Sequence, residues 1–579
     1  MPETKPPSPG LMWHVKRTKL WKSIFRHDFA DTPRTRLQRI FGNVFLHLHP
    51  VRINKDAIKP TYTWGLGGIS FYLFLFLTFT GVLLMFYYRP TTIHAFRDMK
   101  DLAFAVTMGG FTRNLHRWSA HAMVIFVMLH MIRVFLTGAY KPPREYNWVI
   151  GVILLVLTLL LSYTGYLLPW DQLALWAVTV GANMAANTPV LGAEGPFSIA
   201  TVTNDARFVM LGGTSVGENA LLRFYVMHCV AIPFIFLIFV AVHLWRVRKD
   251  GFSKTTGEKV DVWPHLVSRE LLAALLVTAV LALWSVWLQA PLEEIANPTL
   301  TPNPSKAPWY FVGLQELLVY FDPWIAGVTL PGIIVLGLMA IPYVDVNPQG
   351  VGEYTFRKRP FAMTLFLTGA AMWFLLIAIG YYCRGPNWEW YWPGQAWSHH
   401  KITKLTLKNL PNLWGALLLL SYFGQGFAVP KWAKEQAATK VGPKAVPMAL
   451  AGYHLLLGLL MSASILAPLI WEPSLFTTLG QAKNAPVMLL LYRLAQTLGP
   501  HLAPVVMGAI VAVFGLVLGG LGCWSAKPKD GLLDQLGPLK YAIVMGLLLM
   551  MFGVVGKIVL RLAFGVKYLI TVPAVSFNI

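Results

Sequence analysis

Long apolar stretches separated by polar segments dominate the chain from residue 65 onward. A helix needs about 20 mostly apolar residues to cross the hydrocarbon core of a membrane. Because a backbone in lipid must satisfy its own hydrogen bonds, such stretches are expected to be helical. The pattern predicts an all-α integral membrane protein with eleven spans, lettered A to K: 65–88, 114–137, 148–169, 224–245, 269–289, 328–344, 362–382, 411–429, 447–471, 503–524 and 541–562.

The distribution of basic residues orients these spans. The chain has 48 Lys and Arg, and about two-thirds of them fall in segments that are cytoplasmic if the N-terminus is cytoplasmic. Such residues are enriched in the cytoplasmic loops of membrane proteins. We therefore expect a multi-pass protein of the cell (cytoplasmic) membrane with a cytoplasmic N-terminus and, after eleven spans, an external C-terminus.

Composition excludes several classes of protein. Charged residues make up 13% of the chain and apolar residues 56%, against roughly 25% charged in soluble domains. The net charge of +22 follows from membrane topology, so no nucleic acid is expected as a partner. Cys229, Cys383 and Cys523 are too far apart for a disulfide framework, a Cys-ligated iron–sulfur cluster or a C-x-x-C-H haem attachment.

Four histidines lie at matching heights on two predicted spans. His116 and His130 of span B are 14 residues apart, on one helix face and about 21 Å apart along the axis. His228 and His243 of span D are 15 residues apart, about 22 Å. Both spans run inward, so His116 pairs with His228 at the outer end and His130 with His243 at the inner end. The pattern predicts two haems, each bound by two histidines.

Glycines on the neighbouring spans repeat the same spacing. Gly67 and Gly81 of span A, and Gly151 and Gly165 of span C, are each 14 residues apart. A residue without a side chain lets a flat macrocycle approach the backbone. Close packing of helices is the alternative use of such small residues. The match to the histidine spacing favours the haem interpretation.

Two arginines flank the histidines of span B. Arg113 and Arg133 each lie three residues, or one helical turn, from a histidine. Their charges are suited to neutralising haem propionates. Anchoring the helix at the membrane interface is the alternative role.

These residues and their surroundings resemble the cytochrome b subunit of the quinol-oxidising cytochrome bc-type complexes. The 15-residue spacing on span D, the Trp170-Asp171 pair and the Arg-Trp after His116 resemble the photosynthetic, plastoquinol-oxidising branch most. In that branch the first four spans and the next three are separate polypeptides, whereas here they are fused. The matching stretches lie within residues 40–385 and are Leu66-Gly-Gly-Ile-Ser, the histidines of span B, Gly165-Tyr-Leu-Leu-Pro-Trp-Asp-Gln172, Arg223-Phe-Tyr-Val-Met-His228 and the segment between spans E and F.

The resemblance implies a reaction and partners. Quinol is oxidised at the outer face, one electron passing to a Rieske iron–sulfur protein and the other through two b-type haems to a quinone at the inner face, which builds a proton gradient. Since the chain has no motif for an iron–sulfur cluster or a c-type haem, a Rieske protein and a c-type cytochrome are expected as partner subunits. Members of the family are homodimers.

The resemblance also divides the chain and assigns candidate quinone-site residues. Arg248 is a candidate at the inner quinone site, or an ordinary cytoplasmic basic residue. For the outer site, interfacial packing is the alternative role of each aromatic residue in the implied set, which is Tyr166, Pro169, Trp170, Trp309 and Tyr310. The expected parts are a basic N-terminal segment (1–64), a dihaem four-helix bundle (65–262), a three-span unit with the outer quinol-site loop (263–385) and a four-span extension (386–579) that offers a docking surface for further membrane subunits.

The sequence departs from the family pattern at two positions. Gly65 stands where the photosynthetic branch has a cysteine that tethers a third haem, so no covalently attached haem is expected. Pro308 replaces the glutamate of Pro-Glu-Trp-Tyr, which accepts a proton from quinol in the family. Glu316, or Asp171 on the other wall, is a candidate substitute. A solvated or helix-capping carboxylate is the alternative role of Glu316.

Two other functions remain open from the sequence. The missing glutamate fits a non-bifurcating dihaem cytochrome that links the quinone pool to another dehydrogenase or reductase. A transporter or scaffold whose histidines bind nothing is a second alternative. Transporter sites use broken helices and charged residues at the membrane midplane, and such residues are scarce here.

Overall fold

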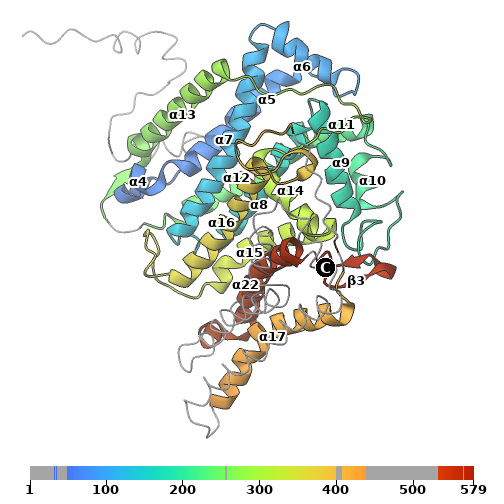
Figure 1. Cartoon of the computed structure of the whole chain (residues 1–579). Coiled ribbons are helices and arrows are strands. Elements are labelled where there is room, and N and C mark those ends of the chain that lie inside the picture. The colour runs from blue at the N-terminus through green and yellow to red at the C-terminus, as the bar shows by residue number, and fades with distance from the viewer. Residues whose placement is uncertain are drawn as a thin grey trace, which may run out of the picture.

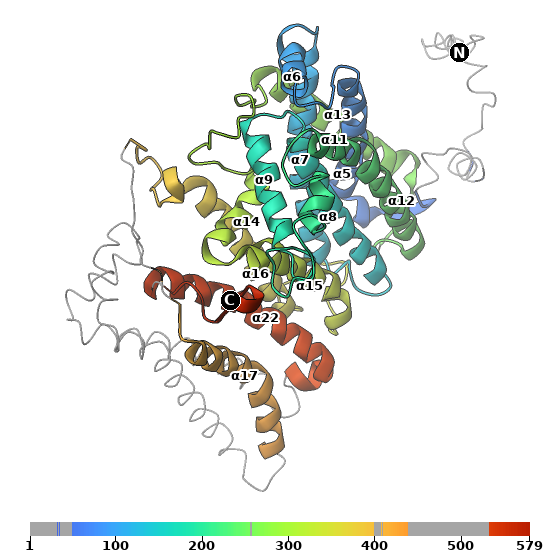
Figure 2. The same cartoon turned by 90° about the vertical axis from the view of Figure 1, so that its right-hand side faces the viewer.

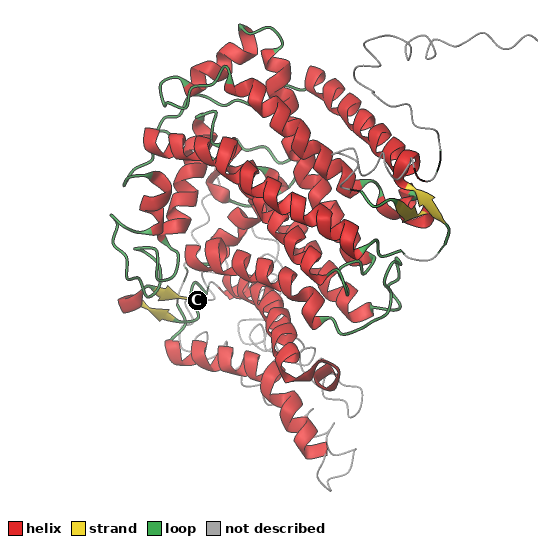
Figure 3. Ribbon diagram, turned by 180° about the vertical axis from the view of Figure 1, so that it is seen from behind, coloured by secondary structure: helices red, strands yellow, loops and turns green. Residues whose placement is uncertain are grey.

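The computed structural model describes residues 32, 34, 49–254, 257–398, 407, 409–437, 532–564 and 566–579. This part of the chain is helical almost throughout, with two short pairs of strands (Figure 3). The predicted all-α membrane fold is confirmed. Predicted spans I and J and most of the N-terminal segment lie outside the described residues.

Among the described residues, eight helices are long and apolar enough to cross a membrane, and they correspond to predicted spans A to G and K. Span H is a helix, α17 (Asn412–Ala437), with a shorter apolar stretch, Asn412–Gly424. Span D is built from α11 (Glu218–Val226), a π-helical turn η3 (Met227–Ala231) and α12 (Ile232–Asp250). The others are α5 (Leu66–Met85), α7 (Gly109–Leu136), α8 (Glu145–Tyr166), α13 (Val262–Trp287), the π-helical turn η4 (Trp324–Thr329) with α15 (Leu330–Val344), α16 (Pro360–Tyr382) and α22 (Leu532–Phe564).

Shorter elements connect these helices. Three of the connecting helices, α9, α10 and α14, lie in the two long loops that follow spans C and E. The connecting elements are β1 (Arg52–Asn54), η2 (Lys55–Ile58), α4 (Pro60–Thr63), α6 (Ala95–Phe104), α9 (Gln172–Ala186), α10 (Ala206–Leu211), β2 (Lys259–Asp261), α14 (Trp309–Tyr320), η5 (Pro386–Trp388), β3 (Thr571–Val572), η6 (Pro573–Val575) and β4 (Phe577–Asn578).

Helices α5, α7, α8 and α12 form a bundle around a shared apolar core (Figure 1). Leu73 of α5 and Ile150 of α8 are almost completely buried in it. Phe74 and Phe236 stack across the bundle with ring centroids 4.4 Å apart. Helix α13 lies against α5 and α7 on the outside. The bundle therefore brings together the four spans that carry the histidines and the repeated glycines.

The segment before span A and the loops after spans B, D and F, which the sequence assigns to one side of the membrane, contact one another at one end of the molecule. We call this end the N-terminal face. Strand β1 pairs antiparallel with β2, in the loop after span D. The Tyr62 hydroxyl hydrogen-bonds Ser253 at 2.8 Å, and Tyr354 donates to the Tyr62 carbonyl at 2.9 Å. The N-terminal face comprises residues 49–64, 137–144, 251–254, 257–261 and 345–359.

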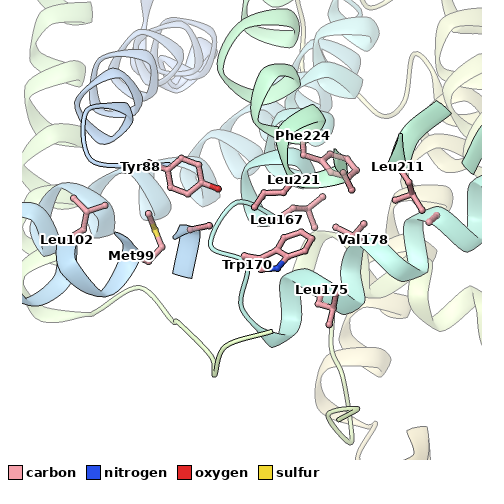
Figure 4. Packing of buried hydrophobic residues seen from close by; sticks show 13 residues of the cluster. Tyr88, Met99, Leu102, Leu167, Trp170, Leu175, Val178, Leu211, Leu221 and Phe224 are labelled. Atoms are coloured by element: carbon pink, nitrogen blue, oxygen red, sulfur yellow. The ribbon is translucent and has the colours of Figure 1, made fainter. Parts of the chain in front are cut away.

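The remaining loops meet at the opposite end, the C-terminal face. Tyr88, in the loop after span A, donates a hydrogen bond to the Leu168 carbonyl at 2.7 Å. Figure 4 shows Leu167, Trp170 and Leu211 in one apolar cluster with Tyr88. The loops therefore have a core of their own above the spans. The C-terminal face comprises residues 86–108, 167–217, 288–323, 383–398 and 566–579.

The described parts of the C-terminal extension pack against the three-span unit. Helix α22 lies between α15 and α17 in Figures 1 and 2. Helices α17 and α22 run antiparallel, since Asn412 bonds Thr571 while Gly426 accepts a hydrogen bond from Tyr541 at 2.7 Å. The end of α17 and the beginning of α22 therefore lie at the same end of this helix pair.

The C-terminal residues pack against loops that connect the spans. The hairpin β3–β4 places Phe577 against Phe197, with ring centroids 5.8 Å apart. Trp324 of η4 donates to the carbonyl of Asn578 at 3.0 Å. Tyr568 bonds the carboxylate of Asp322. The extension is thus bound into the C-terminal face.

Replacing Gly415 with alanine is expected to weaken the packing of α17 against the C-terminal segment, residues 566–579. A Cβ at Gly415 would collide with the carbonyl oxygen of Leu569, whereas a Cβ at Gly424 would meet no atom within 4 Å. Glycine-to-alanine changes otherwise favour a helix by about 1 kcal/mol. Gly415→Ala should lower the thermal unfolding temperature of the solubilised protein, and Gly424→Ala should leave it unchanged or raise it. Equal unfolding temperatures would contradict this packing.

Candidate haem and quinol site

Each predicted histidine faces one predicted glycine across the bundle. A Cβ on Gly81 would lie 3.2 Å from Cε1 of His116, and the His228 ring fills the position of a Cβ on Gly165. At the other end, a Cβ on Gly67 would lie 3.0 Å from Cε1 of His130, and one on Gly151 3.7 Å from Cε1 of His243. The four contacts form two groups at two heights. They match the predicted pairing of His116 with His228 and of His130 with His243.

The pair near the C-terminal face is arranged as two metal ligands would be. The rings of His116 and His228 are 6.3 Å apart between centroids, with planes at 82°. Nδ1 of His116 contacts the Thr80 hydroxyl at 2.9 Å, and Nδ1 of His228 contacts the Thr164 hydroxyl at 3.2 Å. With Nδ1 occupied, Nε2 remains as the coordinating atom. These residues fit a bis-histidine haem.

A π-helical turn explains the longer histidine spacing on span D. His228 lies in η3 (Met227–Ala231), where the helix takes a wider turn. Such a turn inserts one extra residue into an α-helix and occurs frequently at functional sites. The extra residue makes the His228 to His243 interval 15 residues, against 14 on α7. The two histidine pairs can therefore share the same two heights.

The flanking arginines bind backbone carbonyls. Arg113 donates to the carbonyls of Ala290 at 2.9 Å and Pro291 at 2.7 Å. Arg133 donates to the Tyr62 carbonyl at 3.1 Å and lies over the Tyr62 ring at 4.6 Å. Both arginines therefore anchor loops in the structure. Arg248 lies in the last turn of α12, near the N-terminal face.

Aromatic residues of α14 contact His121 of α7, five residues after His116. Trp309 donates a hydrogen bond from its indole nitrogen to Nδ1 of His121 at 3.1 Å. Tyr310 is 4% exposed, and its ring lies edge-on to His121 at 5.7 Å. The Trp118 ring is 5.5 Å from His121 on another side. Sequence reasoning gave His121 no role, because nothing local distinguishes it from a structural histidine.

The other predicted quinol-site residues lie at the end of α8 and in the loop that follows it. Tyr166 lies beneath Arg117, whose guanidinium carbon is 4.7 Å from the ring centroid. Arg117 also interacts electrostatically with Tyr310, so one cation lies near both Tyr166 of α8 and Tyr310 of α14. Trp170 is turned into the loop core (Figure 4), and Pro169 is partly buried just before it. The structure thus brings Tyr166, Trp309 and Tyr310 together and gives Trp170 a packing role.

Asp171 and Gln172 join the two long loops. Asp171 caps α9 by accepting from the Ala174 amide at 2.9 Å, and its other oxygen accepts from the Glu293 amide at 3.2 Å. Gln172 accepts from the Asn297 amide at 2.7 Å. Burial raises the pKa of the Asp171 carboxyl, opposed by these amide hydrogen bonds and by Arg117 and Arg113. Both carboxylate oxygens of Asp171 are therefore engaged in holding the loops.

Glu316 lies in a buried ion pair. Its side chain is completely inaccessible, and Arg384 donates to both of its oxygens, the shortest contact being 2.6 Å. Tyr320 donates to the same carboxylate at 2.6 Å and Trp388 at 2.9 Å. Glu316 is thus neither solvated nor a helix cap. A carboxylate with four such contacts accepts a proton only if the ion pair breaks, so the geometry favours a structural role and disfavours the predicted catalytic one.

Removing the charge of Glu316 is expected to destabilise the protein. Glu316→Gln leaves the buried guanidinium of Arg384 without a counter-charge, which costs roughly 3–5 kcal/mol. The exposed Glu294→Gln variant is the matched control. We expect a lower unfolding temperature for Glu316→Gln alone, and partial recovery when Arg384→Met is added. An unchanged unfolding temperature for Glu316→Gln would show that the pair contributes nothing.

Asp171 should make stability depend on pH. Its folded-state pKa is raised by burial, whereas the unfolded chain titrates near 3.9. As pH rises from about 3.9 to the higher folded-state pKa, Asp171 ionises in the unfolded chain before it does in the folded one, so the wild type loses stability. Asp171→Asn retains a capping oxygen and does not ionise. Its unfolding temperature relative to wild type should therefore rise between pH 4 and pH 8, and a difference that is constant with pH would refute the assignment.

Comparisons with known proteins agree with this geometry. The sequence profile of the Cytochrome b/b6/petB family matches residues 55–251. Cytochrome b6 of Heliomicrobium gestii is 41% identical over 209 residues, covering 35% of this chain and 93% of that protein. Cytochrome b6 of Acaryochloris marina is 40% identical over 188 residues, covering 32% and 82%.

The fold is also similar to a solved structure. The similarity to a chain described as "Hyperthermophilic respiratory Complex III" has a TM-score of 0.50 at 24% identity and covers 64% of this chain and 91% of that one. At this identity the likeness concerns the fold. It extends beyond the matched residues 55–251, to spans after the first four. The chain is therefore a multi-pass membrane protein that belongs to the cytochrome b/b6 family, as a cytochrome b subunit of the bc type.

Proposed function

We propose that the chain binds two b-type haems and is the quinol-oxidising subunit of a bc-type oxidoreductase. The observation that carries this proposal is the set of four glycine–histidine contacts at two heights. His116 and His228 would hold one haem near the C-terminal face, and His130 and His243 the other near the N-terminal face. When bound, the two haems relay single electrons between these faces.

The residues near the C-terminal face supply the quinol site. Tyr166, Trp309 and Tyr310 present aromatic rings beside the outer histidine pair, and Arg117 supplies a cation between the two walls. Asp171 and Glu316 hold the loops and α14 in position. The electron acceptor is a separate subunit, a Rieske iron–sulfur protein followed by a c-type cytochrome. An inner quinone binds near Arg248, at the N-terminal face.

The remaining predictions follow from the same family role. The C-terminal face is external and the N-terminus cytoplasmic, in the cell membrane, in a complex that is a homodimer. The four proposed parts are 1–64, 65–262, 263–385 and 386–579. Gly65 has no thiol to tether a haem, so no covalently attached haem is part of the proposal. Leu413 and Leu420 of α17 are exposed and suit further membrane subunits or lipid.

One observation favours the second candidate function. Pro308 has no ionisable side chain where the family has a proton acceptor, which fits a non-bifurcating dihaem cytochrome. Isolation of the native complex separates the two. A Rieske subunit that copurifies supports bifurcation, and a dehydrogenase or reductase in its place supports the alternative.

A reduced-minus-oxidised spectrum of the purified complex tests the proposed function. We expect two b-type haems and, by pyridine haemochrome, no c-type haem in this polypeptide. His116→Ala should abolish the haem near the C-terminal face, and Gly165→Val should reduce it, because its side chain would occupy the position of the His228 ring. Gly556→Val, where an added Cβ meets nothing within 4 Å, is the control. A wild-type spectrum without b-type haem would end the proposal.

A further inference from the structure

The strongest unused group beside the proposed quinol site is His121. It lies on α7 five residues after His116, which turns it about 140° away from the histidine pair. There it faces α14 and contacts Trp309, Tyr310 and the Trp118 ring. The ring is thus surrounded by aromatic side chains that come from two helices. Trp309 and Tyr310 directly follow Pro308, where the family has its proton acceptor.

The two carboxylates singled out from the sequence are already engaged. Glu316 is held by Arg384, Tyr320 and Trp388. Asp171 has one oxygen on the Ala174 amide and the other on the Glu293 amide. Proton uptake by either carboxylate would disrupt contacts that hold the loops. A base in this region therefore has to be another group.

The hydrogen bond with Trp309 defines the protonation state of His121. An indole N–H only donates, so Nδ1 of His121 accepts and carries no proton. The imidazole is then neutral, with its proton on Nε2. Nδ1 is a basic lone pair at the aromatic wall of the site.

We propose that His121 is the catalytic residue that accepts a proton from quinol, in place of the missing glutamate. This rests on the proposed function. A quinol hydroxyl replaces the Trp309 indole as donor to Nδ1, and as the quinol is oxidised its O–H bond breaks and the proton bonds to Nδ1. Oxidation of one quinol releases two electrons, which the iron–sulfur partner and a b haem would accept, and two protons, of which one passes to Nδ1 of His121 and the other would leave with the iron–sulfur partner. The imidazolium then releases its proton to water at the C-terminal face.

The test measures duroquinol-dependent reduction of the c-type cytochrome in the intact complex. His121→Gln keeps an oxygen for the Trp309 indole but removes the base, and turnover should fall at least 100-fold with both b haems retained. The matched control is His94→Gln. His94 lies on the same face, where it contacts Thr91 at 2.9 Å, and this variant should turn over as the wild type does.

A second variant separates catalysis from a structural effect. Added imidazole should restore turnover at least tenfold in His121→Ala, because it supplies the missing base. Wild-type turnover in His121→Gln, or His121→Ala turnover that imidazole does not raise, would overturn the role of His121. A wild-type complex that holds both haems but does not oxidise duroquinol would instead overturn the proposed function.

Discussion

The four-helix bundle of α5, α7, α8 and α12 depends on contacts in which a glycine of one helix faces a histidine ring of another. At Gly165 the His228 ring occupies the position that a side chain would fill, and the same relation holds, less tightly, at Gly67, Gly81 and Gly151. Because the glycines of α5 and α8 face histidines of α7 and α12, they fix how these four helices are placed. Loops 86–108 and 167–217 of the C-terminal face connect these spans, so the placement of the helices also determines where these loops and their aromatic residues lie.

Local periodicity was sufficient to predict the features that repeat along helices. The spacing of His116 and His130 sets their heights without any knowledge of the neighbouring helix, and the matching glycines identify which helices face them. The alternation of loops between two faces follows from the order of the spans, and contacts such as β1 with β2 agree with it. The π-helical turn at His228 was not predicted, because its extra residue resembles an ordinary change of spacing.

Long-range polar contacts were beyond the reach of the sequence. Glu316 and Arg384 are 68 residues apart, and nothing near either one indicates that they form a buried pair. Arg113 was a candidate for neutralising a haem propionate, with anchoring as the alternative, and nothing near it in the sequence indicates that it donates to the carbonyls of Ala290 and Pro291. Sequence reasoning assigned no role to His121, because its partners Trp309 and Tyr310 belong to a helix nearly 200 positions later. Tertiary packing decides each of these roles.

The position of the last strand has a consequence for how the protein is made. All four histidines and their facing glycines have been synthesised once residue 243 is added, whereas Phe577 and Asn578, which contact Phe197 and Trp324, are added more than 300 residues later. At about 5–20 residues per second the interval is roughly 20–70 s. The haem pockets can therefore mature while the C-terminal face is still incomplete, and a chain that stops early would retain its histidine pairs but leave that face unfinished.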